Sequence, residues 1–151
     1  MNKKKRRLAV VLATVTGSAV LVLSGCSGKS EQTEKTLRVG VITYSQDDPF
    51  INGLTEELKV QLKAMENKQR RIIVSTKSGN DDQQEQNEKV EEMIDAGCDV
   101  LCINLVDRTA PSRIVRMARN EDIPVIFFNR EPVREDLMQW EKLYYVGCDA
   151  E

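Results

Sequence analysis

The sequence alternates short β-type apolar runs with segments of helical spacing, and this alternation limits the possible folds more than any other feature. Five runs enriched in Val, Ile, Tyr and Phe are typical of strands: 37–44, 71–75, 99–104, 125–129 and 143–147. Helical patterns follow the first three of them. Parallel strands joined by right-handed helical crossovers form an open sheet covered on both faces. The sequence therefore predicts an α/β fold with a five-stranded parallel sheet in the order 2-1-3-4-5.

The predicted helices carry start and stop signals as well as apolar faces. Asp48 and Pro49 suit the N-cap and first turn of a helix whose inward positions are Ile51, Leu54, Leu58, Leu62 and Met65. A second helix is expected at 82–96, with Gly97 as its C-terminal stop. A third is expected at 111–120. The acidic run within 81–92 is predicted to be a solvated helix face.

Polar side chains follow three of the predicted strands, in the loops 44–50, 104–107 and 129–132. Ligands of open parallel sheets bind outside the carboxyl ends of the strands, where these loops meet. Carboxylates and amides can bind sugar hydroxyls, and a flat ring can cover the apolar face of a pyranose. Asp48, Asn104 and Phe50 would supply these groups. Each also has a structural alternative: Asp48 as an N-cap alone, Phe50 in the core, and Asn104 as a partner for buried backbone.

The N-terminus predicts export and a lipid anchor. Five basic residues at positions 3–7 precede an apolar stretch, 8–23, and then Leu23-Ser24-Gly25-Cys26, which resembles the lipobox of bacterial lipoproteins. Processing of this kind would remove residues 1–25 and attach lipid to Cys26, with 26–35 as a flexible tether. The alternative is a signal-anchor helix, but the stretch contains four Thr, Gly or Ser residues and is shorter than the roughly 20 apolar residues of a span.

Charge and composition narrow the partners. Removal of 1–25 would take away five of the 22 Lys and Arg residues and none of the 24 Asp and Glu residues, which leaves a formal charge near −7. This balance argues against nucleic acid or an anionic membrane as the main partner. The chain has no histidine, which excludes His-dependent triads and His metal sites. Catalysis is therefore not expected.

Two cysteines, Cys98 and Cys102, are close enough in sequence to suggest a metal pair. Cys102 falls inside an apolar strand, however, and no further cluster of ligand residues is nearby. Both are predicted to be small buried side chains instead. No metal or other cofactor is predicted for this chain.

Four segments resemble a known family in the right order: 39–44 with Asp47, Asp48 and Phe50, then 103–107, 124–132 and 144–147. Together they resemble the galactose/glucose-binding members of the type I periplasmic binding proteins, which deliver sugar to an ABC permease. The resemblance spans 37–151. It implies that Asp48 and Asn104 bind sugar hydroxyls, that Phe50 stacks on the sugar, and that Tyr44 lines the crevice.

The resemblance also implies an incomplete binding site. Family members have two lobes that close on the sugar, and 36–151 corresponds to the N-terminal lobe alone. A second stacking Trp, further contacts and a calcium-binding loop would belong to the other lobe. Trp140 is expected to pack or cover the surface, and does not replace that Trp. Cys148 stands where the family commonly has Thr, and Pro49 replaces a polar residue.

Two other functions fit the same residues. A sugar-sensing module for a chemoreceptor or histidine kinase would have an identical sheet and a different partner. A glycoside hydrolase would use Asp47 and Asp48 as an acid/base pair. The two carboxyl groups of such a pair must stand roughly 5 to 10 Å apart with the sugar between them, and adjacent residues on one loop are poorly placed for this. The expected location is the outer face of the cell membrane or the periplasm.

Overall fold

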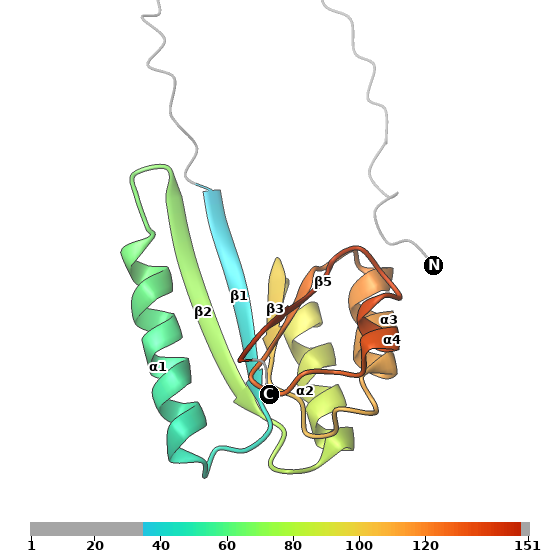
Figure 1. Cartoon of the computed structure of the whole chain (residues 1–151). Coiled ribbons are helices and arrows are strands. Elements are labelled where there is room, and N and C mark those ends of the chain that lie inside the picture. The colour runs from blue at the N-terminus through green and yellow to red at the C-terminus, as the bar shows by residue number, and fades with distance from the viewer. Residues whose placement is uncertain (1–34, 149–151) are drawn as a thin grey trace, which may run out of the picture. The chain divides into compact units, whose positions relative to one another are not determined.

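A computed structural model describes residues 35–148 (Figure 1). The predicted signal peptide, Cys26 and most of the predicted tether lie outside the described residues. The elements are, in order, β1 (Lys35–Thr43), α1 (Pro49–Ala64), β2 (Arg70–Ser78), α2 (Gln83–Asp95), β3 (Val100–Ile103), α3 (Ser112–Asn120), β4 (Val125–Phe128), α4 (Arg134–Leu137) and β5 (Leu143–Val146). The sequence did not predict α4, which has a single turn.

The strands form one parallel sheet in the order β2-β1-β3-β4-β5, which confirms the predicted fold class and strand order. β1 and β2 are longer than the others. They pair from Lys35 and Arg70 onward, whereas β3 joins β1 only at Val39. The first part of the β1–β2 ladder therefore extends beyond the start of β3 (Figure 1).

The two faces of the sheet are covered unequally. α2 and α3 pack on one face over the larger apolar cluster, which includes Ile42, Leu101 and Phe127. The other face carries a smaller cluster around Val41 and Cys102, and α1 packs on it through its half-buried leucines, Leu58 and Leu62. Parallel sheets are normally covered on both faces, so this uneven cover leaves apolar surface open.

The predicted inward face of α1 is partly wrong. Leu54 is 39% exposed and Met65 is 57% exposed. Met65 is the C-cap and lies past the last turn, while Leu54 borders an open apolar groove of about 600 Å³. The groove lies between α1 and β3–β5 and is lined by Phe50, Leu54, Leu58, Cys102, Ile126, Phe128, Asn129, Val146, Gly147 and Cys148. Helical periodicity located the apolar stripe, but it could not tell how far the neighbouring layer extends.

Local signals read from the sequence are otherwise confirmed. Asp48 and Asp82 cap α1 and α2, and Gly97 follows α2 with a φ of 78°. Trp140 is buried in the larger cluster, as packing predicts. The acidic side chains of 81–92 are at the surface or half-buried, as a solvated face predicts.

Cys98 and Cys102 are both buried, as predicted for small apolar side chains, while Cys148 is exposed. Cys98 belongs to the larger apolar cluster and Cys102 to the smaller one on the opposite face of the sheet, so these two thiols cannot share a metal ion. No group of three potential ligand side chains comes together within 35–148. Over the same residues, no helix is both long and apolar enough to cross a bilayer.

Candidate functional site

The residues predicted to bind sugar lie at or just beyond the carboxyl ends of β1 and β3. Tyr44 and Asp48 follow β1, Phe50 is in the first turn of α1, and Asn104 follows β3. The backbone N–H of Asn104 donates to the carbonyl of Ile42 at 2.9 Å, which holds the two strand ends together. This edge lies opposite the end at which the described chain begins (Figure 1).

Asp48 joins the helix start to the edge. Its Oδ1 accepts from the N–H groups of Phe50 (2.8 Å) and Ile51 (3.3 Å), and its Oδ2 accepts from the Tyr44 hydroxyl at 2.5 Å. The Tyr44 bond and the helix N–H groups lower the pKa of Asp48, and the same bond raises the pKa of Tyr44. Asp48 is therefore an ionised acceptor, and its Oδ2, which accepts only from the Tyr44 hydroxyl, has a second lone pair for a ligand hydroxyl. The N-cap and ligand interpretations are compatible.

Arg130 completes this cluster and was not among the site residues predicted from the sequence. Its guanidinium lies 3.6 Å from the centre of the Tyr44 ring. Its Nη1 donates to the carbonyls of Leu105 and Val106 at 3.2 and 3.1 Å, which links the loops after β3 and β4. The sequence signal that could have identified Arg130 is a basic residue in the loop 129–132, directly after a predicted strand. The cluster therefore contains a donor cation, an acceptor carboxylate and an aromatic hydroxyl.

Phe50 and Asn104 differ sharply in exposure. Phe50 is 66% exposed, so it is not a core residue and its ring is available to a ligand. Asn104 is 0% exposed, and its Nδ2 donates to the Phe128 carbonyl at 3.0 Å. This contact is the structural alternative considered for Asn104. Its Oδ1, however, has no partner within the described residues.

Two glutamines of α2 form hydrogen bonds to the loop after β3 and hold it in place. Gln86 is fully buried; its Nε2 donates to the Asn104 carbonyl at 2.9 Å, and its Oε1 accepts from the Val106 N–H at 3.0 Å. Gln83 accepts from the Asp107 N–H at 2.8 Å. These bonds fix the loop after β3 to the start of α2. A glutamine inside an amphipathic pattern gave no sequence signal for this role.

The family follows from a match over most of the chain. Residues 39–151 match the model of the periplasmic binding protein domain. The chain belongs to this family. The resemblance inferred from four separate segments is thereby confirmed, and the sheet order is that of the family's domains.

Similar proteins bind sugars. The chain is 31% identical to the D-galactose/methyl-galactoside binding periplasmic protein MglB of Haemophilus influenzae, over 92% of this chain and 39% of that protein. A solute-binding protein of an ABC transporter from Clostridium phytofermentans, solved with β-D-glucose, is 25% identical with a TM-score of 0.62, over 74% of this chain and 32% of that one. The fructose-binding periplasmic domain of a hybrid two-component system is 29% identical with a TM-score of 0.60, over 75% and 34%.

The chain thus spans 39% of the length of the curated relative that it matches. Each of these relatives is named as a binding protein or domain, in agreement with the expectation of a non-enzyme. The arrangement is suited to hold hydroxyl groups.

Proposed function

We propose that this chain is the N-terminal sugar-binding lobe of a substrate-binding protein for galactose- or glucose-type monosaccharides that serves an ABC transporter. The observation that carries the proposal is the cluster of Tyr44, Asp48 and Arg130 beside the exposed ring of Phe50. In this proposal Asp48 accepts from sugar hydroxyls, Phe50 stacks on the ring and Tyr44 lines the crevice. The unpartnered Oδ1 of Asn104, which is buried in this structure, meets the sugar only once the loops around it have moved. No cofactor is required.

We further propose that the protein is exported and held at the outer face of the membrane, or in the periplasm, by lipid on Cys26. The segment around Cys26 resembles a lipobox, and the family comprises periplasmic binding proteins. Anchoring by lipid would keep the binding lobe near a membrane permease without spanning the bilayer. Mass spectrometry of protein from membranes tests this directly: a diacyl modification on an N-terminal Cys26 supports it, and an unmodified residue contradicts it.

A second candidate function is sensing. The fructose-binding domain of a hybrid two-component system shares this fold at 29% identity, so the same lobe could signal to a kinase or chemoreceptor instead of a permease. The two candidates share the sugar edge and differ in the partner. Co-purification from membranes with permease subunits, as opposed to a sensor kinase, distinguishes them.

Sugar binding is tested by a titration of the full chain. Micromolar affinity corresponds to about 8 kcal/mol, and half of that free energy gives a dissociation constant near 1 mM. We therefore expect millimolar galactose or glucose to shift the backbone NMR signals of Tyr44, Asp48 and Phe50, and Asp48→Ala to abolish these shifts. Asp47→Ala, on the same loop, is the matched control. Micromolar binding in calorimetry would contradict the proposal that this lobe holds only half of the sugar contacts. The absence of any NMR shift would contradict sugar binding at the carboxyl ends of the strands.

A further inference from the structure

Basic side chains gather at the end of the sheet where the described chain begins, although the chain as a whole is acidic. Lys35 opens β1 and pairs with Arg70 at the start of β2, with Arg71 next to it. Lys68 lies in the turn before β2. All four are exposed, and none of them forms an ion pair within 35–148. We call Lys35, Lys68, Arg70 and Arg71 the basic pole.

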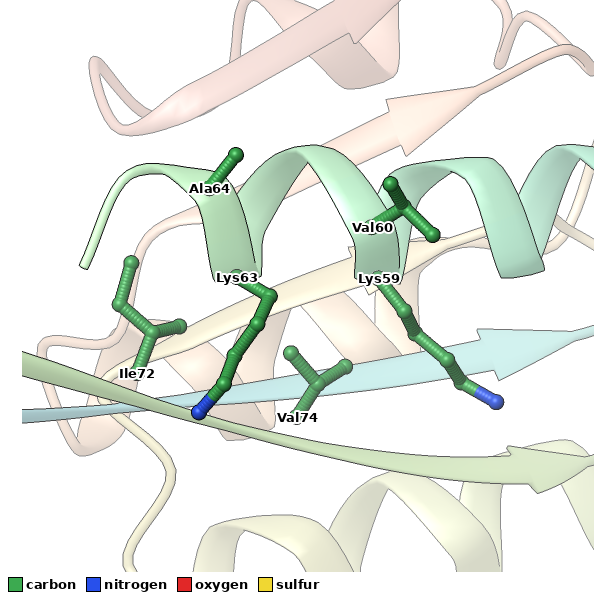
Figure 2. A pocket seen from close by; sticks show the side chains of 6 residues that line it. All are labelled: Lys59, Val60, Lys63, Ala64, Ile72 and Val74. Atoms are coloured by element: carbon green, nitrogen blue, oxygen red, sulfur yellow. The ribbon is translucent and has the colours of Figure 1, made fainter.

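Apolar side chains are exposed beside the basic pole. Met65 is 57% exposed and Val60 is 60% exposed near the end of α1. Figure 2 shows the adjoining groove between α1 and β2, where two lysine side chains reach past apolar groups. Its lining is Lys59, Val60, Lys63, Ala64, Ile72 and Val74. Basic and apolar groups side by side suit a surface that rests on lipid headgroups.

Two acidic residues of the described chain, Glu66 and Asp99, lie close to this end, and both are already bonded. Glu66 binds Lys63 at 2.5 Å and the Ile72 N–H at 2.8 Å. Asp99, before β3, accepts from the N–H of Arg38. Lys35 lies three residues before Arg38 in β1, closer to the end of the β1–β2 ladder. Three strand residues span about 10 Å, which exceeds the Debye length of about 8 Å at physiological salt. Repulsion from the acidic side is therefore largely screened at the basic pole.

We propose that the basic pole docks on the anionic lipid headgroups of the membrane that carries the Cys26 anchor. This inference rests on the proposed lipid anchor. Nine residues, 27–35, reach at most about 30 Å, so the start of β1 cannot lie far from the anchored residue. Because all strands are parallel, a docked basic pole turns the opposite edge, with Tyr44 and Asp48, away from the membrane (Figure 1). A net acidic chain is repelled elsewhere on its surface, which favours this one orientation.

The test places a fluorophore at either end of the sheet in the full chain, reconstituted with vesicles that carry a lipid-borne quencher. One label is at Gln69→Cys, in the turn of the basic pole, in a Cys148→Ser background; the other is at the native Cys148. Cys98 and Cys102 are buried, and Cys148→Ser alone is the labelling blank. We expect the Gln69→Cys label to be quenched strongly on vesicles with phosphatidylglycerol and weakly on pure phosphatidylcholine, and Cys148 to be quenched weakly on both.

Charge variants make the test specific. Lys68→Gln, Arg70→Gln and Arg71→Gln together should lower the ratio of docked to undocked protein about fivefold per charge, hence about a hundredfold at low salt. The matched control removes three exposed arginines of α3 (Arg113→Gln, Arg116→Gln and Arg119→Gln) and should leave quenching unchanged. Equal quenching at the two labels, or an equal loss in the control, overturns the proposal. If the protein dissociates from vesicles of pure phosphatidylcholine, the lipid anchor alone is disproved. Docking of the basic pole is still measured by quenching on the vesicles with phosphatidylglycerol.

Discussion

Replacement of Gln86 by methionine should destabilise the fold by loosening the candidate site. Gln86 is fully buried in α2, and its side-chain amide bonds the Asn104 carbonyl at 2.9 Å and the Val106 N–H at 3.0 Å. A longer contact of 3.5 Å reaches the Thr43 carbonyl. Methionine has a similar length and volume, so Gln86→Met removes the polar partners and leaves little cavity.

The magnitude follows from the two backbone groups that lose their partner. A buried donor or acceptor without a hydrogen bond costs about 1–3 kcal/mol. Two such groups, with part of the cost offset by burial of an apolar side chain, give a loss of about 2–4 kcal/mol. This is a large fraction of the roughly 5–15 kcal/mol that stabilises a typical domain. Urea unfolding, followed by circular dichroism and by the fluorescence of Trp140, should show a midpoint lower by about 2 M.

The matched control is Gln84→Met, two residues earlier on the exposed side of the same helix. Among the described residues Gln84 donates only to Glu88, at 3.3 Å, so its replacement should change the stability by less than about 0.5 kcal/mol. The sugar-induced NMR shifts should also weaken in Gln86→Met and persist in Gln84→Met. If the two variants unfold at the same urea concentration, the loop after β3 does not depend on Gln86 and the reasoning is refuted.

Three further predictions concern single positions. The lowered pKa of Asp48 means that its stabilising effect is complete at neutral pH and is lost as the pH falls below about 4. Asp48→Asn still caps the helix and should make the free energy of unfolding fall less steeply below pH 4, and an unchanged fall would contradict this. Gly79→Ala should lose about 1–3 kcal/mol in urea unfolding because a Cβ there would lie 2.8 Å from the Cβ of Gln86, whereas Gly53→Ala, with open space around it in α1, should gain up to about 1 kcal/mol. In the folded chain Cys148→Ser should abolish one rapidly reacting thiol in a titration with a disulfide reagent, and equal reactivity in the two proteins would show that Cys148 is not exposed.

The sequence predicted the sheet because strand periodicity, helix caps and chain order are local properties. Pro49 after Asp48 marked the start of α1, and Gly97 marked the end of α2. Strand order followed from the rules for right-handed crossovers and from the resemblance. The short helix α4 escaped because one turn carries no periodicity.

The candidate site was predictable only in part. The chain order placed Tyr44, Asp48 and Asn104 at the carboxyl ends of strands, which is where they lie. Arg130 was not selected, because its position over the Tyr44 ring depends on the path of the loop after β4. The burial of Asn104 likewise depends on the loops packed around it.

The sequence by itself determined the fold class, the strand order, the helix starts and the class of chemistry at the ligand edge. Only the tertiary structure decided which charges meet: it joined Tyr44, Asp48 and Arg130 in one cluster and gathered Lys35, Arg70 and Arg71 at the opposite end of an acidic chain. The physical reason is that periodicity and capping act within a few residues, whereas electrostatic neighbours are set by strand register and loop paths between residues far apart in the chain.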